Sequence, residues 1–248
     1  MKEIEGNIMP YIFIKFCDKI EYAKDICNGD LYSNTIDYFR EVELNTGNSS
    51  QGDKNELTLN PIPSSIKILD IETDELLGQA DSIANIRFDS DSKKTIVSLV
   101  GIEIKSMEKL DYAENNSYYL KLPFTDSEIS KMSDSFGKYC VIIDPPELYN
   151  NLYIYSKLNG IYTCINKVNY NSNSKEHINC FFNESVNRFF YKESKFSYQR
   201  EYRILFDMKL PCDHFIKIGK IANSKIFKSE DLKNLIFSKD FKIFQKNI

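Results

Sequence analysis

The sequence has no tryptophan, only two histidines and no glycine-rich phosphate-binding motif. Neither G-x-x-x-x-G-K-[ST] nor G-x-G-x-x-G occurs, so nucleotide hydrolysis on a phosphate-binding loop is excluded. The G-x-S-x-G motif of serine hydrolases is also absent. His177 and His214 have no nucleophile near them in the sequence, which argues against general-base chemistry by histidine.

The sequence also lacks a metal-binding spacing and a membrane segment. Its six cysteines are scattered, without a C-x-x-C pair or a histidine at zinc-finger spacing, so we expect no structural metal. No apolar run approaches the roughly 20 residues of a membrane span, and charges interrupt the first residues where a signal sequence needs an apolar run. We therefore expect a reduced, cytoplasmic protein with no membrane partner.

A large excess of charge of one sign is likewise missing. The chain has 32 Lys+Arg against 36 Asp+Glu, a net charge of -4, so no extended basic surface is expected for nucleic acid. A nucleic-acid or protein partner would need a local patch. What the chain does have is length and aromatic side chains: 248 residues with 16 Tyr and 17 Phe can bury a substantial core.

The hydrophobic pattern predicts one α+β domain over residues 1–248, with a mainly antiparallel, strand-rich core flanked by several short helices. In the first half we expect a strand at 11–16, a helix at 17–28, one or two strands within 30–40, a loop at 43–56, and an antiparallel meander over 57–105.

The second half carries clearer helix signals. Thr125 and Glu128 have capping-box spacing, which predicts a helix over 125–137, and two prolines after Asp144 predict the start of another helix that ends at Gly160. The remaining expected elements are strands at 138–144, 161–170, 198–207 and 213–221, a helix ending near residue 191, and a small C-terminal helix at 229–237.

The segment 191–207, "YKESKFSYQREYRILFD", concentrates chemically active side chains before an apolar strand. If the strand begins near residue 198, Gln199, Glu201 and Arg203 project from one face, with alternate residues about 6.5 to 7 Å apart. This alternation is also typical of a solvated edge strand. The functional interpretation is that the row borders a pocket, with Lys192 and Phe196 arriving from the preceding turn.

The spacing of these five residues resembles the K-x3-W-x2-E-x-E-x-R signature near the C-terminus of a large bacterial family of domain-of-unknown-function proteins. Phe196 stands where that family has Trp, and Gln199 stands where it has the first Glu. The family also carries an N-D-P-x-E element, which "GDKNE" resembles after a longer gap than usual and which brings Asp53 and Glu56. The resemblance implies a shared fold but no settled activity.

A second resemblance implies a mechanism. The sequence Gln199-Arg200-Glu201 is similar to the Q/E-x-E motif on a late strand of ADP-ribosyltransferases, whose last Glu orients the nicotinamide ribose. Cleavage of the nicotinamide bond builds an oxocarbenium-like cation, which a carboxylate stabilises in the transition state. The resemblance implies that Glu201 is the catalytic carboxylate, that Gln199 places the acceptor, and that NAD is the substrate.

The same resemblance implies an NAD-binding set that includes Lys192, Phe196 and Arg203. Lys15 in "YIFIKF" would stand where these enzymes have an Arg or His on the first strand, although lysine is a poorer bidentate donor. Tyr32 and Ser33 are the nearest candidates for the family's middle motif. The leading hypothesis is an NAD-dependent ADP-ribosyltransferase-like enzyme of the toxin or anti-phage defence type, with an unknown protein or nucleic-acid acceptor.

Two alternatives stay open. One is a non-catalytic binding module of a bacterial or phage conflict system, which binds a partner protein or a small nucleotide and in which Glu201 and Arg203 form a structural ion pair. The other is a metal-dependent nuclease, in which Glu103 and Lys105 of "GIEIK" would act with Asp89 or Asp91 on Mg²⁺.

Overall fold

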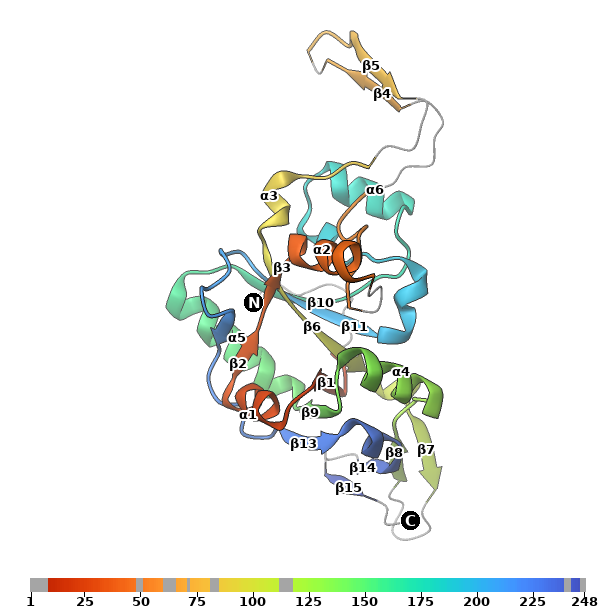
Figure 1. The fold of residues 1–248 in the computed structure, drawn as a ribbon, viewed down its shortest axis with the longest axis vertical. Helices are drawn as coiled ribbons and strands as arrows, with labels where there is room; N and C mark the ends of the chain where they lie inside the picture. The colour runs from red at the N-terminus through yellow and green to blue at the C-terminus, as the bar shows by residue number, and fades with distance from the viewer. Residues whose placement is uncertain are drawn as a thin grey trace.

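The computed structural model describes residues 9–47, 51–59, 66–70, 72–80, 85–111, 118–238 and 242–245. The fold is α+β with mainly antiparallel sheets, which confirms the predicted class (Figure 1). The helices are α1 (Ile20–Asn28), α2 (Ile36–Thr46), α3 (Asp89–Ser92), α4 (Asp126–Phe136), α5 (Pro145–Asn159) and α6 (Lys175–Phe182), with 3₁₀ turns η1 (Ile104–Ser106), η2 (Val186–Phe190), η3 (Ser194–Gln199) and η4 (Ser229–Asn234). Within the described ranges, no helix has the length and apolar character needed to cross a membrane.

Among the described residues, the strands form one large sheet and three small ones. The large sheet has the order β10-β11-β6-β1-β9-β13, and β3 also pairs with β6. The strands are β1 (Ile12–Cys17), β2 (Asp30–Tyr32), β3 (Asn34–Thr35), β4 (Ile66–Leu69), β5 (Leu76–Ala80), β6 (Thr95–Ile102), β7 (Glu108–Asp111), β8 (Tyr118–Lys121), β9 (Tyr139–Ile143), β10 (Thr163–Lys167), β11 (Glu201–Phe206), β12 (Phe215–Lys217), β13 (Lys225–Lys228), β14 (Leu235–Ser238) and β15 (Ile243–Gln245).

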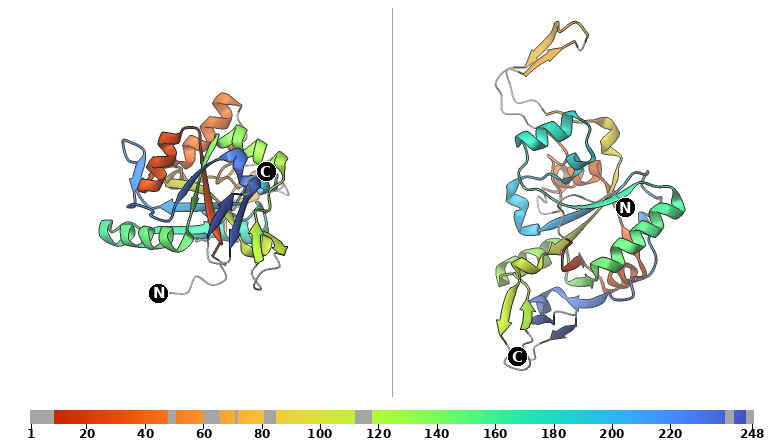
Figure 2. Two further views of the ribbon diagram at one scale, coloured as in Figure 1. Left: turned by 90° about the horizontal axis from the view of Figure 1, so that it is seen from below. Right: turned by 180° about the vertical axis from the view of Figure 1, so that it is seen from behind.

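The core lies on both faces of the large sheet because consecutive residues of β1 are apolar. Phe13 joins a buried cluster with Leu148 and Leu152 of α5, whereas Ile12 and Ile14 join a second cluster that includes side chains of α4. Strand alternation sends neighbouring side chains to opposite faces. Figure 2 shows α4 and α5 on opposite sides of the sheet, in agreement with the two clusters.

The large sheet opens between two of its central strands. Residues 12–14 of β1 pair with residues 100–102 of β6, and residues 34–35 of β3 pair with residues 95–96 of β6. Between these two pairings, residues 97–99 of β6 have no strand neighbour on that side among the described residues. From residue 15 onward, β1 is paired with β9 alone. This opening creates the space for a cavity.

Strand β11 lies inside this sheet, between the edge strand β10 and β6. All six of its residues are buried, so the interpretation of this segment as a solvated edge strand is wrong. Its polar face is nevertheless the one predicted, since Glu201 and Arg203 alternate with Tyr202 and Ile204 of the apolar core.

Helix ends agree best with the sequence predictions. Gly29 ends α1 with φ 83°, the left-handed conformation that favours glycine. Thr125 and Glu128 form the predicted capping box of α4. Pro145 begins α5, and Gly160 ends it with φ 65°. These boundaries depend on local interactions, which the sequence displays directly.

The segment 30–40 corrects one prediction. Only residues 30–32 and 34–35 are extended, and α2 begins at Ile36, where strands were expected. The reason is a helix cap, because the Thr35 side chain accepts a hydrogen bond from the Tyr38 amide. The helix extends to Thr46, so the predicted loop at 43–56 begins later, and its residues 48–50 lie outside the described residues.

The predicted meander over 57–105 is also wrong where it can be examined. Strands β4 and β5 form a separate hairpin that stands away from the rest of the molecule in Figure 1, residues 89–92 are helical, and β6 pairs with strands distant in sequence. Residues 60–65, 71 and 81–84 of this prediction lie outside the described residues. Strand β6 is buried and pairs with other strands on both sides. The alternation of apolar and polar residues within a segment does not specify such distant partners.

Three later boundaries differ from the predictions. The helix expected to end near residue 191 ends at Phe182 and is followed by η2, and β11 begins at Glu201 because residues 194–199 form η3. Arg200 joins η3 to β11 in a left-handed conformation with φ 46°. The expected C-terminal helix is the 3₁₀ turn η4, followed by β14. The strand expected within 213–221 is present as β12, but it pairs with β2 and not with β11, the strand before it, as its place in the sequence suggested.

Candidate functional site

A cavity of about 600 Å³ lies where the large sheet opens between β1 and β6. It is lined by side chains from β1, α1, β2, α2 and β6 and from the segment 192–203. Its volume is within the range of small-molecule and cofactor sites. Eight of the residues proposed from the sequence line it: Lys15, Tyr32, Ser33, Glu56, Lys192, Gln199, Glu201 and Arg203.

Lys15 crosses the opening in the sheet. Its Nζ donates a hydrogen bond of 2.7 Å to the backbone oxygen of Ser98 on β6. Burial lowers the pKa of Lys15 to about 8, against the opposing effect of the Glu201 carboxylate. The first strand therefore does bring a cation into the cavity that Glu201 lines, and this cation loses its proton at mildly alkaline pH.

The Glu201 carboxylate is held by three donors. Its Oε1 accepts from Ser98 Oγ at 2.6 Å and from Arg203 Nε at 2.7 Å, and its Oε2 accepts from Lys192 Nζ at 3.0 Å. Burial alone would raise the pKa of Glu201, but Arg203 and Lys192 outweigh it and hold that pKa well below its usual range. Glu201 is thus ionised while 4% exposed.

Arg203 joins Glu201 to the loop that carries Glu56. Its Nη1 and Nη2 donate to Glu56 Oε1 and Oε2 at 2.6 and 2.9 Å, and Nη1 also donates to the Phe189 oxygen at 2.8 Å. Arg40 fixes the backbone of the same loop by donating to the oxygens of Glu56 and Leu57. The segment "GDKNE" therefore contributes its Glu56 to a buried ion-pair network.

Lys192 connects Gln199 to this network. Its Nζ donates to Gln199 Oε1 at 3.0 Å as well as to Glu201, and it lies 4.5 Å from the Phe196 ring centroid. We expected Gln199 on the strand, but it belongs to η3. It still lines the cavity together with Glu201. Phe196 is buried and is not among the described residues that line the cavity.

Asp53 and Ser33 have other surroundings than expected. Asp53 lies outside the large cavity, against a space of about 10 Å³ that Lys192 also borders. Burial, with Glu56 second, raises the pKa of Asp53 to about 7, and Lys192 opposes the shift. Ser33 lines the cavity, but its hydroxyl donates to the His214 backbone oxygen at 3.0 Å.

The carboxylates of the nuclease alternative are engaged elsewhere. Glu103 forms ion pairs with Lys105 at 2.7 Å and with Lys167, whereas Asp91 forms one with Arg188 at 2.7 Å. Across the described part of the chain, no group of three His, Cys, Asp or Glu residues is arranged to hold a metal ion. Glu103 and Asp91 are therefore each paired with cations, and the nuclease alternative stays a hypothesis.

Sequence reasoning missed Ser98 and most of the aromatic residues that line the cavity, among them Tyr22, Tyr38 and Phe215. Ser98 occupies "IVSLV", where a single hydroxyl interrupts an apolar run. That interruption is a signal that could have identified it, because Ser98 is the one residue of β6 that is only half-buried. No comparable local signal marks the aromatic residues in a chain with 33 Tyr and Phe, the sum of 16 and 17.

No protein-family model, curated protein or solved structure matches the chain. Its function is therefore argued from the geometry of the cavity.

Proposed function

We propose that the protein is an NAD-dependent ADP-ribosyltransferase-like enzyme that acts in the cavity between β1 and β6. The observation that supports this proposal is that an ionised carboxylate, Glu201, and a cation from the first strand, Lys15, line one cavity of about 600 Å³. A dinucleotide needs both groups, since its phosphates are anionic and its reacting ribose becomes cationic.

The chemistry assigned to Glu201 is electrostatic. When the bond between ribose and nicotinamide breaks, its electron pair leaves with the nicotinamide nitrogen and positive charge develops on the ribose. The fixed negative charge of Glu201 stabilises that charge, and an acceptor nucleophile then forms the new bond to the ribose carbon and gives up its proton. Lys15 and Lys192 supply cations for the phosphates.

The geometry around Glu201 leaves room for a ligand hydroxyl. An ionised carboxylate has about four lone-pair positions. Oε1 already accepts from Ser98 and Arg203, whereas the donor to Oε2 among the described residues is Lys192. The remaining acceptor position of Oε2 is therefore the one assigned to a ribose hydroxyl.

The second candidate, a non-catalytic nucleotide-binding module, is favoured by a specific observation. Arg203 is bound to both Glu201 and Glu56, so the three side chains also form a buried structural network. A network of this kind can fix β11 against the loop without any turnover. The two candidates share the same ligand site and differ in whether NAD is cleaved.

The test is nicotinamide release from NAD labelled in the nicotinamide ring. We expect the native protein to release nicotinamide and Glu201→Gln, which keeps the shape but removes the charge, to release it about 100- to 1,000-fold more slowly. Glu103→Gln is the matched control, because Glu103 is also buried and bound by two lysines but does not line the cavity.

Thermal unfolding of both variants establishes that they are folded. Equal release by Glu201→Gln and the native protein would contradict the catalytic role. NAD binding without release by the native protein would support the binding module in place of the transferase.

A further inference from the structure

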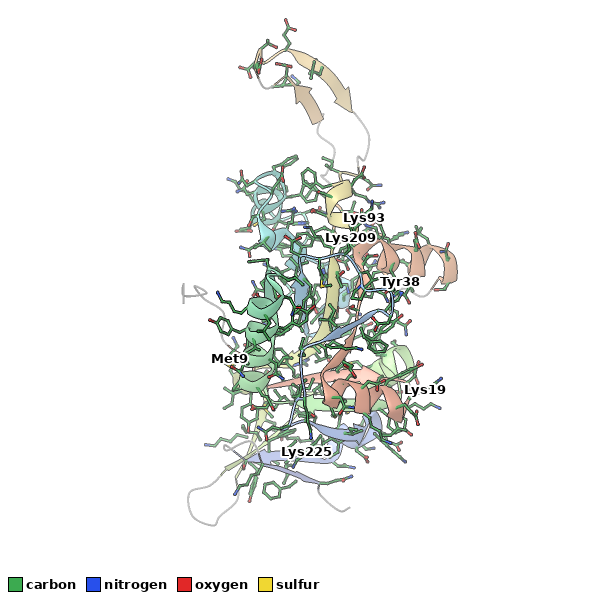
Figure 3. The ribbon with its side chains drawn as sticks, turned by 90° about the vertical axis from the view of Figure 1, so that its left-hand side faces the viewer. Met9, Lys19, Tyr38, Lys93, Lys209 and Lys225 are labelled. Carbon is green, nitrogen blue, oxygen red and sulfur yellow. The ribbon has the colours of Figure 1, made fainter. Side chains whose placement is uncertain are left out.

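Exposed aromatic side chains border the cavity on the side of α1 and α2. Tyr22 of α1, Tyr32 of β2 and Tyr38 of α2 all line the cavity, yet they are 46%, 50% and 42% exposed. In Figure 3, Tyr38 and Lys19, which directly precedes α1, lie on the same side of the molecule. A single exposed tyrosine needs no explanation, but three from separate elements around one cavity form a shared feature, which we call the tyrosine rim.

The ring of Tyr32 is held in place by its neighbours. It stacks on His214 with centroids 5.6 Å apart and planes at 11°, and it meets Phe215 edge-on at 5.6 Å. The pairing of β2 with β12 sets Tyr32 opposite Phe215. The His214 ring in turn lies 2.9 Å from Asn34 Oδ1, and its backbone oxygen accepts from the Ser33 amide. Tyr32 is therefore ordered before any ligand binds.

Half of the Tyr32 surface remains for a ligand, since this residue is 50% exposed and lines the cavity. His214 stacks on one face of the ring and is not among the described residues that line the cavity, whereas Phe215 does line it. Tyr38 lines the same cavity as Tyr32, and burial, followed by Tyr32, raises the pKa of Tyr38. An ordered, half-exposed ring gives large contact area with little loss of conformational entropy.

We propose that the tyrosine rim is a nucleobase-stacking subsite, and that the cavity takes a purine nucleotide whose base stacks on Tyr32 and whose phosphate extends inward to Lys15. The base stacks because aromatic rings attract offset parallel rings. The phosphate is drawn inward because Lys15 is the cation that crosses the opening of the sheet. This subsite deepens the proposed function. It rests on that function only for the identification of the purine nucleotide as part of NAD.

The subsite is tested by calorimetric titration of the full chain with AMP and with ribose 5-phosphate. We expect AMP to bind more tightly, because only AMP carries a base. Tyr32→Ala should weaken AMP binding about fivefold to a hundredfold, while ribose 5-phosphate binding stays unchanged and Tyr32→Phe retains the native affinity for AMP. A fluorescent ethenoadenosine monophosphate should be quenched by the native protein and not by Tyr32→Ala.

Tyr153→Ala is the matched control, because Tyr153 is 61% exposed on α5 and does not line the cavity. Equal affinities for AMP and ribose 5-phosphate, or equal losses in Tyr32→Ala and Tyr153→Ala, would overturn the subsite. A thermal unfolding midpoint for Tyr32→Ala close to the native value shows that its loss of binding is not a loss of fold.

The outcomes separate this inference from the proposed function. Tyr32-dependent AMP binding without nicotinamide release would leave the nucleobase subsite standing and remove the transferase. Nicotinamide release that depends on Glu201, together with AMP binding that ignores Tyr32, would leave the transferase standing and remove the subsite.

Discussion

Arg203 and Glu56, 147 positions apart in the chain, form a bidentate ion pair with N–O distances of 2.6 and 2.9 Å. Their side chains are 1% and 3% exposed. The pair connects β11 to the loop 51–59, and because Arg203 also binds Glu201, it positions the carboxylate that lines the cavity. Such bidentate pairs combine strength with a fixed geometry.

The first prediction concerns this pair. Glu56→Gln should lower the free energy of unfolding by about 3 to 5 kcal/mol, because it leaves the buried Arg203 with one carboxylate in place of two. Urea denaturation measures the change. The control is Glu108→Gln, since Glu108 is 63% exposed in its pair with Lys121 and should cost less than about 1 kcal/mol. Equal costs for the two substitutions would show that the Arg203 pair is not a structural constraint.

The sequence predicted the features that depend on local interactions. The caps at Thr125 and Gly29, and the shared face of Glu201 and Arg203 on one strand, follow from spacing within a few residues. The face shared by Glu201 and Arg203 is the part of the candidate site that could be placed on an element in advance. Gln199 was placed on that strand as well, but a 3₁₀ turn and the left-handed Arg200 precede β11.

The convergence of the site could not be predicted from local patterns. Lys15 and Glu201 line one cavity because β6 pairs with β1 on one side and β11 on the other, and because β1 leaves β6 after residue 14. Those pairings join segments far apart in the chain, and no single segment records its partner. The ion pair of Glu56 with Arg203 has the same origin, so the spacing of Asp53 and Glu56 did not indicate the partner of Glu56.

The second prediction concerns the charge of Lys15. Because burial lowers its pKa to about 8, the ammonium loses its proton as pH rises through that value, and the affinity for AMP should fall between about pH 7 and about pH 9. The AMP phosphate keeps its charge over this range, as its second pKa is about 6. Of the groups facing Lys15, Glu201 stays ionised and Cys17 has a pKa raised by burial to about 11.

Calorimetric titration across this pH range checks the prediction. Lys15→Met should bind AMP more weakly at neutral pH and show a flat pH profile, whereas Lys19→Met, which removes a cation beside the Tyr22 ring, should keep the native profile. A native profile that is already flat would mean that Lys15 does not contact the anionic part of the ligand.

The third prediction concerns Asp53. Burial, followed by Glu56, raises its pKa to about 7, so the folded state binds a proton that the unfolded state has released between its ordinary value of 3.8 and about 7. The stability of the native protein should therefore fall as pH rises through this window. Asp53→Asn removes the ionising group and can still accept the hydrogen bond from the Asn55 amide.

We expect Asp53→Asn to raise the free energy of unfolding above pH 7 by on the order of 4 kcal/mol, and to change it little near pH 4. Urea denaturation at both pH values measures this. Asp134→Asn, on the exposed face of α4, is the comparison variant and should leave the pH profile of stability unaltered. An Asp53→Asn variant that is less stable than the native protein at high pH would show that the ionised carboxylate is required by the fold.

The last prediction compares two glycines with the same backbone conformation. Gly29 ends α1 with φ 83° and Gly160 ends α5 with φ 65°. A Cβ at Gly29 would lie 1.9 Å from the Gly219 oxygen, whereas a Cβ at Gly160 would meet nothing within 4 Å. Gly160→Ala should therefore lower the free energy of unfolding by about 1 to 2 kcal/mol from the left-handed conformation alone. Gly29→Ala should lower it more, because the chain at Gly219 must also move.

The same two variants should also differ in AMP binding. Since β2 follows Gly29 directly and carries Tyr32, Gly29→Ala should weaken AMP binding, whereas Gly160→Ala should preserve it. Equal unfolding free energies for the two variants would mean that the contact between Gly29 and Gly219 does not constrain the position of β2.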